Sequence, residues 1–236
     1  MSTRSLDDVR QWMRDGTSVF VREAGLDDVA LEEPSGLPGW SRHHLIAHVT
    51  ANAEALGNLV HWAATGDPTP MYADAEAREA GIEAGALVPG PALAAWLRRS
   101  ADELEQALNG LTEEQWQAQV RTAQGRMVPA TEVPWMRARE VWIHGIDLAT
   151  GLSFADPPAG LVAALCDEAT DTRDAGPGPK LVMTATDTGG SWEIPGDGDL
   201  VRLAGPLAEI AAYLTGRPHR LTTIEGDPAP DLPAWL

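Results

Sequence analysis

The chain is poor in cysteine, in cations and in two of the three aromatic residues. Its single cysteine, Cys166, excludes an intrachain disulfide, which suits a reducing compartment. Lys and Arg number 17 against 35 Asp and Glu, so the formal net charge is −18. A surface of that sign repels phosphate backbones and anionic lipid, and it argues against binding to nucleic acid or to a membrane. Two Tyr and two Phe beside nine Trp point to no particular function.

Long apolar runs are also lacking. No stretch approaches the roughly 18 apolar residues that a membrane-spanning helix needs. The N-terminal residues MSTRSLDD do not form the apolar core of a secretion signal. We therefore expect a cytoplasmic protein. At 236 residues, with 44% hydrophobic and 22% charged residues, the chain can form one large domain or two modest ones with an apolar core.

The first two-thirds of the sequence predicts a helix bundle. Ser41 stands where an N-cap is expected, and Gly66 and Gly151 are typical helix stops. Four substantial helices with moderate connections favour a four-helix bundle. Helical spacing of apolar residues predicts helices over about 5–25, 41–65, 73–83, 91–109, 112–117 and 133–150, with a loop over 122–129.

The pattern changes after Gly151. The run Ala-Gly-Pro-Gly-Pro at 175–179 predicts a hard break. We therefore expect an α+β protein, with a metal-binding helix bundle over 1–151 and a small C-terminal α+β domain over 152–236. The second part predicts helices over about 159–172 and 206–215 and strands over 181–186, 191–194 and 199–203.

Two helices carry a pattern that suits a metal ion. His44 and His48 are four residues apart on one helix, and Glu140 and His144 are four apart on another. Residues at this spacing share a helix face, so each pair can present two donor atoms to one ion. Burying Glu140 without a partner would be costly, and a divalent cation removes that cost. His48, Glu140 and His144 together leave a coordination position open, as catalytic zinc requires.

Each of these residues also has an ordinary structural interpretation. A lone histidine on an apolar helix face, such as His48, is usually a satisfied core residue. Glu140 could pair with Arg137 or Arg139 at the surface. His44 is a candidate fourth ligand or a support for the ligands. Asp147 either orients a ligand imidazole or is an ordinary surface carboxylate. His43 is expected to face solvent.

Several segments resemble the mycothiol-dependent maleylpyruvate isomerases. The strongest are Gly39–Val49, which reads GWSRHHLIAHV, and Ala123–Asp147. Shorter similarities are His61-Trp62, Thr69–Tyr72 and the terminal Pro-Ala-Trp-Leu at 233–236. The resemblance extends over essentially the whole chain, and it is densest in the predicted bundle and thin between about 155 and 203.

The resemblance implies a specific architecture and site. It implies a DinB-like N-terminal four-helix bundle, a sterol-carrier-like C-terminal α/β sandwich domain, and zinc held at positions matching His48, Glu140 and His144. It also implies an arginine important for activity in the C-terminal domain. That residue matches Arg217, although Arg220 is close enough in the sequence to be the counterpart. Between the domains we expect a small-molecule pocket, in a monomeric enzyme.

The implied reaction converts maleylpyruvate to fumarylpyruvate in gentisate degradation. Addition of a thiolate to the conjugated alkene leaves a single bond, about which rotation and then elimination give the trans isomer. Mycothiol is the implied thiol, activated by the metal, and Arg217 would bind a substrate carboxylate. Cys166 has apolar neighbours and is expected to be structural. Two alternatives remain open: a mycothiol S-transferase acting on other electrophiles, and a metal-binding bundle without catalytic activity.

Overall fold

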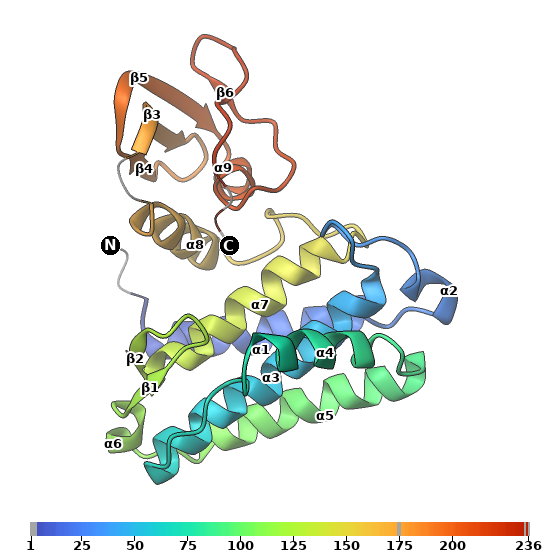
Figure 1. The fold of residues 1–236 in the computed structure, drawn as a ribbon. Coiled ribbons are helices and arrows are strands. Elements are labelled where there is room, and N and C mark those ends of the chain that lie inside the picture. Colours follow the sequence, from blue (N-terminus) through green and yellow to red (C-terminus); the bar gives the residue numbers. More distant parts are fainter. Residues whose placement is uncertain (1–3, 174–175, 234, 236) are drawn as a thin grey trace. The chain divides into compact units, whose positions relative to one another are not determined.

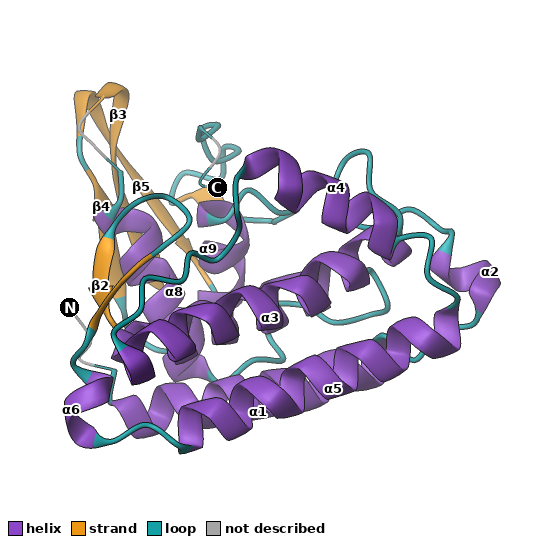
Figure 2. Cartoon of the chain, turned by 60° about the horizontal axis from the view of Figure 1, so that its bottom comes forward, coloured by secondary structure: helices purple, strands orange, loops and turns teal. Residues whose placement is uncertain are grey.

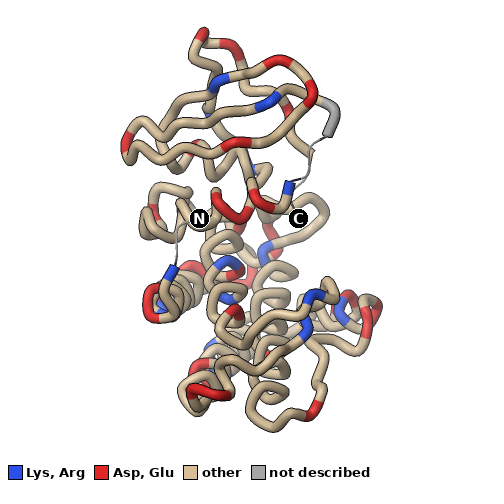
Figure 3. The backbone as a smooth tube through the Cα atoms, turned by 90° about the vertical axis from the view of Figure 1, so that its left-hand side faces the viewer, with Lys and Arg blue, Asp and Glu red and all other residues tan. Residues whose placement is uncertain are grey.

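The structure is a computed structural model that describes residues 4–173, 176–233 and 235, apart from the side chains of residues 176 and 177. The chain divides into two compact units, Ser5–Gly151 and Leu152–Leu236. Figure 1 shows that the first is largely helical and that the second contains a sheet. Acidic side chains outnumber basic ones and are distributed along both units (Figure 3). Among the described residues, none of the helices is long and apolar enough to cross a membrane.

The first unit contains the predicted four-helix bundle. Its helices are α1 (Leu6–Glu23), α3 (Arg42–Thr65), α5 (Gly90–Asn109) and α7 (Val133–Asp147). Helix α3 packs against both α5 and α7, and α7 packs against α1. A Cβ on Gly16 of α1 would lie 2.6 Å from the indole nitrogen of Trp142 on α7, so the absence of a side chain there permits close approach. That indole donates a hydrogen bond of 2.9 Å to the carbonyl of Trp12.

Shorter elements complete this unit. Helices α2 (Asp28–Leu31), α4 (Ala75–Gly85) and α6 (Glu113–Trp116) join the bundle helices, with α4 packed on α3. The loop predicted over 122–129 is wrong in part. Its end forms β2 (Met127–Pro129), which pairs with β1 (Gln119–Arg121) in an antiparallel hairpin that is followed by the 3-10 turn η1 (Ala130–Glu132). Three-residue strands are too short to show an alternating pattern in the sequence.

The second unit is a four-stranded sheet with two helices. Its helices are α8 (Ala159–Asp171) and α9 (Leu207–Leu214), and its strands are β3 (Gly176–Ala185), β4 (Ser191–Ile194), β5 (Gly196–Gly205) and β6 (Thr222–Thr223). The strand order is β4-β3-β5-β6, with β3 and β5 parallel and the outer pairs antiparallel. Helices α8 and α9 pack on each other and against β4 and β3, respectively, which gives the expected α/β sandwich (Figure 2).

The break predicted over 175–179 is wrong for the residues that the structure describes, because β3 already begins at Gly176. Residue 175 lies outside the described ranges. The Pro and Gly residues still disturb the strand, because the pairing of β3 with β5 is irregular on either side of Pro179. A Cβ on Gly196 would meet the carbonyl oxygen of Pro179 at 2.5 Å. Glycine at that position therefore lets β5 begin close against the irregular part of β3.

Candidate metal centre

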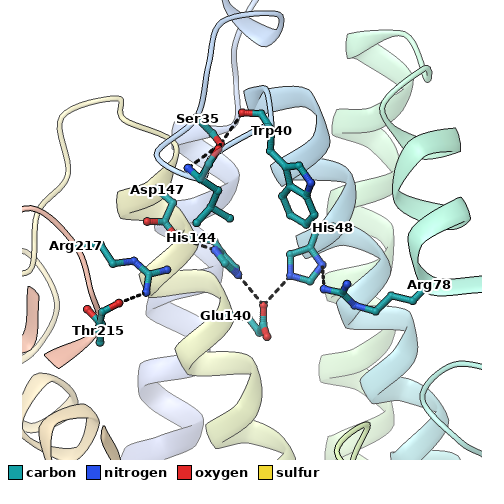
Figure 4. Close-up of polar contacts among 10 residues, drawn as sticks. Ser35, Trp40, His48, Arg78, Glu140, His144, Asp147, Thr215 and Arg217 are labelled. Carbon is teal, nitrogen blue, oxygen red and sulfur yellow. Dashed lines mark hydrogen bonds and ion pairs between the residues drawn. The ribbon is translucent and has the colours of Figure 1, made fainter. Parts of the chain in front are cut away.

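The facing sides of α3 and α7 bring together three of the predicted site residues. His48 comes from α3, and Glu140 and His144 come from successive turns of α7. The Nε2 atoms of both imidazoles lie 3.2 Å from Oε2 of Glu140, and the three candidate donor atoms lie within 4.8 Å of one another. The two imidazole rings are nearly perpendicular, with centroids 5.1 Å apart. Figure 4 shows the three side chains converging on one point between the helices.

Loop contacts fix the ends of the two helices that carry these residues. The Ser41 hydroxyl accepts a hydrogen bond from the backbone nitrogen of His44, which caps α3 as predicted. The next residue, Arg42, donates to the carbonyls of Leu148 and Ala149 at 2.8 and 3.1 Å. These carbonyls follow α7, where a cation is favoured by the helix dipole. The start of α3 is thereby tied to the end of α7, and this holds the two helix faces in register.

Burial and mutual contact shift the pKa values of all three residues. Burial lowers the pKa of His48, although its hydrogen bond to Glu140 opposes the shift. Burial opposes ionisation of Glu140, but hydrogen bonds to both histidines hold the pKa of that carboxyl well below its usual range. Burial also opposes charging of His144, yet hydrogen bonds to Asp147 and Glu140 raise its pKa to about 9. The cluster thus pairs an ionised carboxylate with a protonated histidine when no metal is bound.

The outer nitrogens of the two imidazoles have different partners. Nδ1 of His144 lies 3.0 Å from Oδ2 of Asp147, whose residue is only 3% exposed. A carboxylate behind a ligand imidazole fixes its tautomer and orientation, as in many metal sites. Nδ1 of His48 accepts a 3.4 Å hydrogen bond from Arg78 on α4, and the ring packs against Trp40 at a centroid distance of 5.4 Å. Asp147 therefore has the orienting position that the sequence had left open.

The donor set fits a catalytic divalent metal ion. Two imidazole nitrogens and one carboxylate oxygen converge from two helices, and His144 has the carboxylate support that such ligands use. Among the described residues, no cysteine lies in this cluster, since Cys166 belongs to the second unit. Three ligands without thiolate are typical of a site that keeps one coordination position open for a reactant.

Two other histidines of α3 lie outside the cluster. His43 was predicted to face solvent, but it is only 7% exposed, and its Nε2 donates a 2.7 Å hydrogen bond to the carbonyl of Val88. His44 was a candidate ligand or support. Instead, its Nδ1 lies 2.8 Å from the Ser41 hydroxyl and its Nε2 lies 3.7 Å from Glu83. Of the α3 histidines, the described cluster contains His48 alone.

Sequence reasoning missed three residues around the cluster. Arg78 contacts His48, and its guanidinium carbon lies 5.9 Å from the ring centroid of Tyr72. Arg137, considered only as a surface partner of Glu140, is 1% exposed and donates to the carbonyl of Val49 and the side chain of Asn52. Only the position of Arg137, one turn before Glu140 on the helix face that also carries His144, was a signal in the sequence. Nothing in the sequence singles out Arg78 or Tyr72 for this site.

The remaining predicted residues lie in the second unit. Arg217 follows α9, and its Nη1 donates a 2.7 Å hydrogen bond to the carbonyl of Thr215. Arg220 is exposed, and its backbone nitrogen donates to Glu209. Cys166 lies on α8, where burial and the charge of Asp167 raise the pKa of its thiol far above the usual value. Cys166 is therefore a poor nucleophile, as its apolar neighbours predicted.

Comparisons with known proteins point to one family. The model of the mycothiol maleylpyruvate isomerase N-terminal domain matches residues 3–149. A crystal structure of a mycothiol-dependent maleylpyruvate isomerase is 38% identical, covers 98% of both chains and has a TM-score of 0.91. The structure of a histidine-to-alanine mutant of such an isomerase has the same identity and coverage and a TM-score of 0.92.

A more distant structure shares the fold of the first unit. The protein YfiT from Bacillus subtilis, described as a probable metal-dependent hydrolase with an unusual four-helix bundle topology, is 15% identical. It covers 63% of this chain and 90% of its own, with a TM-score of 0.50. At that identity the likeness shows the bundle fold alone. No curated protein sequence matches the chain.

Proposed function

The chain belongs to the mycothiol maleylpyruvate isomerase family, and on that premise we propose that it catalyses the mycothiol-dependent isomerisation of maleylpyruvate to fumarylpyruvate. The observation that carries this proposal is the 38% identity to a solved isomerase over 98% of both chains. The convergence of His48, Glu140 and His144 supports it independently, because it supplies a three-ligand site with an open position. We further propose that 1–151 and 152–236 act as separate domains of a cytoplasmic monomer.

We propose that His48, Glu140 and His144 hold zinc. Bound there, the metal would lower the pKa of a thiol at its open position. His144 must lose its proton to serve as a ligand, and Asp147 is in place to keep its Nε2 directed at the metal. Trp40 packs against His48 and limits the access of water to that side of the cluster.

The isomerisation requires a reversible change in bond order, which an added thiolate provides. We propose that mycothiol supplies this thiolate. Cys166 is 1% exposed, and burial raises the pKa of its thiol, so it can neither reach a substrate nor ionise readily. The role that we propose for Arg217 is to bind a substrate carboxylate, for which its planar guanidinium is suited.

One experiment tests this function. Maleylpyruvate loss would be followed on metal-analysed protein with mycothiol, with glutathione and with no thiol, for wild type and Cys166→Ser. We expect both proteins to turn over with mycothiol and to be nearly silent without a thiol. Glutathione should be much less effective, because a sugar-linked thiol offers contacts that only a matched pocket uses. Thiol-free turnover that disappears in Cys166→Ser would refute the external thiol.

The same assay separates the alternatives that share the metal site. A mycothiol S-transferase would consume mycothiol in stoichiometric amounts with an electrophile, whereas an isomerase regenerates it in every cycle. A bundle that only stores metal would bind zinc but show no thiol-dependent turnover. Titration of free thiol before and after incubation with maleylpyruvate, and separately with another electrophile, therefore distinguishes all three functions.

A further inference from the structure

A pocket of about 390 Å³ lies in the first unit, beside the metal-binding cluster. One wall is the segment from Pro70 through the first turn of α4, and the other is the turn of the β1–β2 hairpin. The polar side chains on these walls are those of Tyr72, Asp74, Arg78, Arg121 and Thr122. Neither wall takes part in the function proposed above.

Arg78 connects this pocket to the cluster. It lines the pocket, and its Nη2 also donates a 3.4 Å hydrogen bond to Nδ1 of His48. Figure 4 shows the guanidinium of Arg78 directed at the outer side of the His48 ring, opposite Glu140. A guanidinium has five N–H donors, so donors remain available beyond those directed at His48 and Tyr72. An acid paired with Arg78 would therefore be bound next to a candidate metal ligand.

The pocket is cationic, although the protein as a whole is strongly acidic. The side chain of Arg121 is exposed and makes no hydrogen bond or ion pair with the described residues, whereas its backbone pairs with Met127. The single acidic side chain of the pocket lining, Asp74, already accepts a 2.7 Å hydrogen bond from the backbone nitrogen of Ala77 as the N-cap of α4. Two arginines thus line a pocket whose one carboxylate is engaged. On a chain with a net charge of −18, such a site selects for a small anion.

We propose that Arg78 and Arg121 form a carboxylate subsite that binds one end of a dicarboxylate substrate. Planar guanidiniums suit carboxylates, and the hydroxyls of Tyr72 and Thr122 in the lining add neutral donors. This inference rests on the proposed function, since maleylpyruvate carries two carboxylates. The pair Arg78 and Arg121 serves one of them. Mycothiol, a sugar-linked thiol without a carboxylate, would gain little binding affinity from two cationic side chains.

The test uses the full-length, zinc-loaded protein and maleate, a dicarboxylate that does not react in the absence of thiol. Binding is titrated calorimetrically for wild type, Arg78→Gln, Arg121→Gln and Arg126→Gln. Arg126 is the matched control, because it is exposed in the same hairpin but does not line the pocket. Loss of one charged hydrogen bond should raise the Kd for maleate roughly tenfold in the first two variants. The Kd of Arg126→Gln should stay within about twofold of wild type, and zinc content should be full in all four proteins.

Steady-state kinetics separates this inference from the proposed function. For an active isomerase, Arg121→Gln should raise KM for maleylpyruvate and leave KM for mycothiol unchanged. Unchanged maleate affinity in both pocket variants of an active isomerase overturns the subsite while the function stands. A raised KM for mycothiol alone also overturns it, because the pocket would then hold the thiol. Arginine-dependent maleate binding in a protein without isomerase activity supports the subsite and refutes the proposed reaction.

Discussion

The two units bury different kinds of side chain. The interior of the bundle contains four side chains that can carry a charge, those of His43, His48, Arg137 and Asp147. Among the described residues of the second unit, the buried polar side chains are neutral at pH 7: two threonines, the phenol of Tyr213 and the thiol of Cys166. Thr170 donates to the carbonyl of Cys166, and Thr215 donates to that of Ala211, so each bonds within its own helix.

This difference indicates which unit buries ionisable groups at a cost in folding free energy. Burying an ionisable group costs several kcal/mol unless it is paired, and Arg137 retains two buried nitrogens, Nε and Nη2, without a partner among the described residues. The bundle accepts that cost mainly around one cluster, whereas the buried polar groups in the described part of the second unit are uncharged. Ligands of the cluster should therefore stabilise the bundle by linkage, and the second unit should contribute through part-buried groups such as Arg217.

The largest expected effect is the loss of a cluster residue. His48→Ala and His144→Ala should each abolish stoichiometric zinc binding and lower kcat/KM roughly 10³-fold or more, because several kcal/mol of metal-derived stabilisation disappears. Elemental analysis and maleylpyruvate turnover are the measurements. His44→Ala is the matched control, since His44 is on the same helix but outside the cluster, and it should keep full metal. Full zinc content in both cluster variants would show that His48 and His144 are not metal ligands.

A smaller effect is expected from the second unit, and it should leave the metal in place. Arg217→Ala should retain zinc but reduce turnover roughly 10–100-fold, since a charged hydrogen bond to substrate contributes roughly 1.5–3 kcal/mol. Arg220→Ala, with an exposed guanidinium three residues away, should behave like wild type. If Arg220→Ala is inactive and Arg217→Ala is not, the active-site arginine has been misassigned by three residues.

The helices of the bundle were predictable because their signals are local. The prediction of a helix over 41–65 with Ser41 as its cap is confirmed by α3, Arg42–Thr65. The i, i+4 spacing of Glu140 and His144 also predicted correctly that both face one point. Some short elements were missed, because a three-residue strand such as β2 or a four-residue helix such as α2 spans too little sequence for a periodic pattern. The equally short α6 was predicted, and it begins with a capping box at Thr112.

What the sequence could not provide is the pairing of distant segments. Arg78 meets His48 only because α4 packs on α3, and its position on a weakly patterned helix predicts no partner. His43 was assigned to solvent, yet the Val88 carbonyl after α4 covers it. The irregular β3 illustrates the same limit: Pro and Gly disfavour a strand locally, and pairing with β5 overrides that preference.

A third variant examines the buried carboxylate behind the cluster. Asp147→Asn preserves size but removes the charge that faces Nδ1 of His144 at 3.0 Å. Zinc affinity should fall about 10–100-fold, as it does when such supporting groups are lost in other metal sites. Competition with a chromogenic chelator measures this affinity. Glu32→Gln is the control, because Glu32 faces a histidine outside the cluster, His43, at 3.4 Å. Equal affinities of Asp147→Asn and wild type would show that Asp147 does not support the metal.

The smallest effect concerns the pH dependence of stability in the chelator-treated protein. The folded-state pKa of His144 is raised from about 6.5 to about 9, so its charged form stabilises the fold fully below pH 6.5 and this contribution is lost as pH rises to 9. The pKa of His48 is lowered and that of Glu140 lies well below its usual range, so neither residue titrates in this window. In the second unit, burial raises the pKa of Tyr213 to about 12, and its contribution is lost only above pH 10.

Metal-free wild type should therefore lose on the order of 1–3 kcal/mol between pH 6.5 and 9, which is about 3–10 °C in Tm for a chain of this size. Zinc-loaded protein should not show this decline, because the metal replaces the proton on His144 and binds more tightly as pH rises. The Tm of chelator-treated His144→Gln should likewise not change with pH over this window. Circular dichroism melts at several pH values, with and without chelator, measure all three. If the Tm of chelator-treated wild type stays constant or rises over this window, His144 is not protonated in the folded state. The pH dependence of the bundle's stability would then not come from the metal-binding cluster.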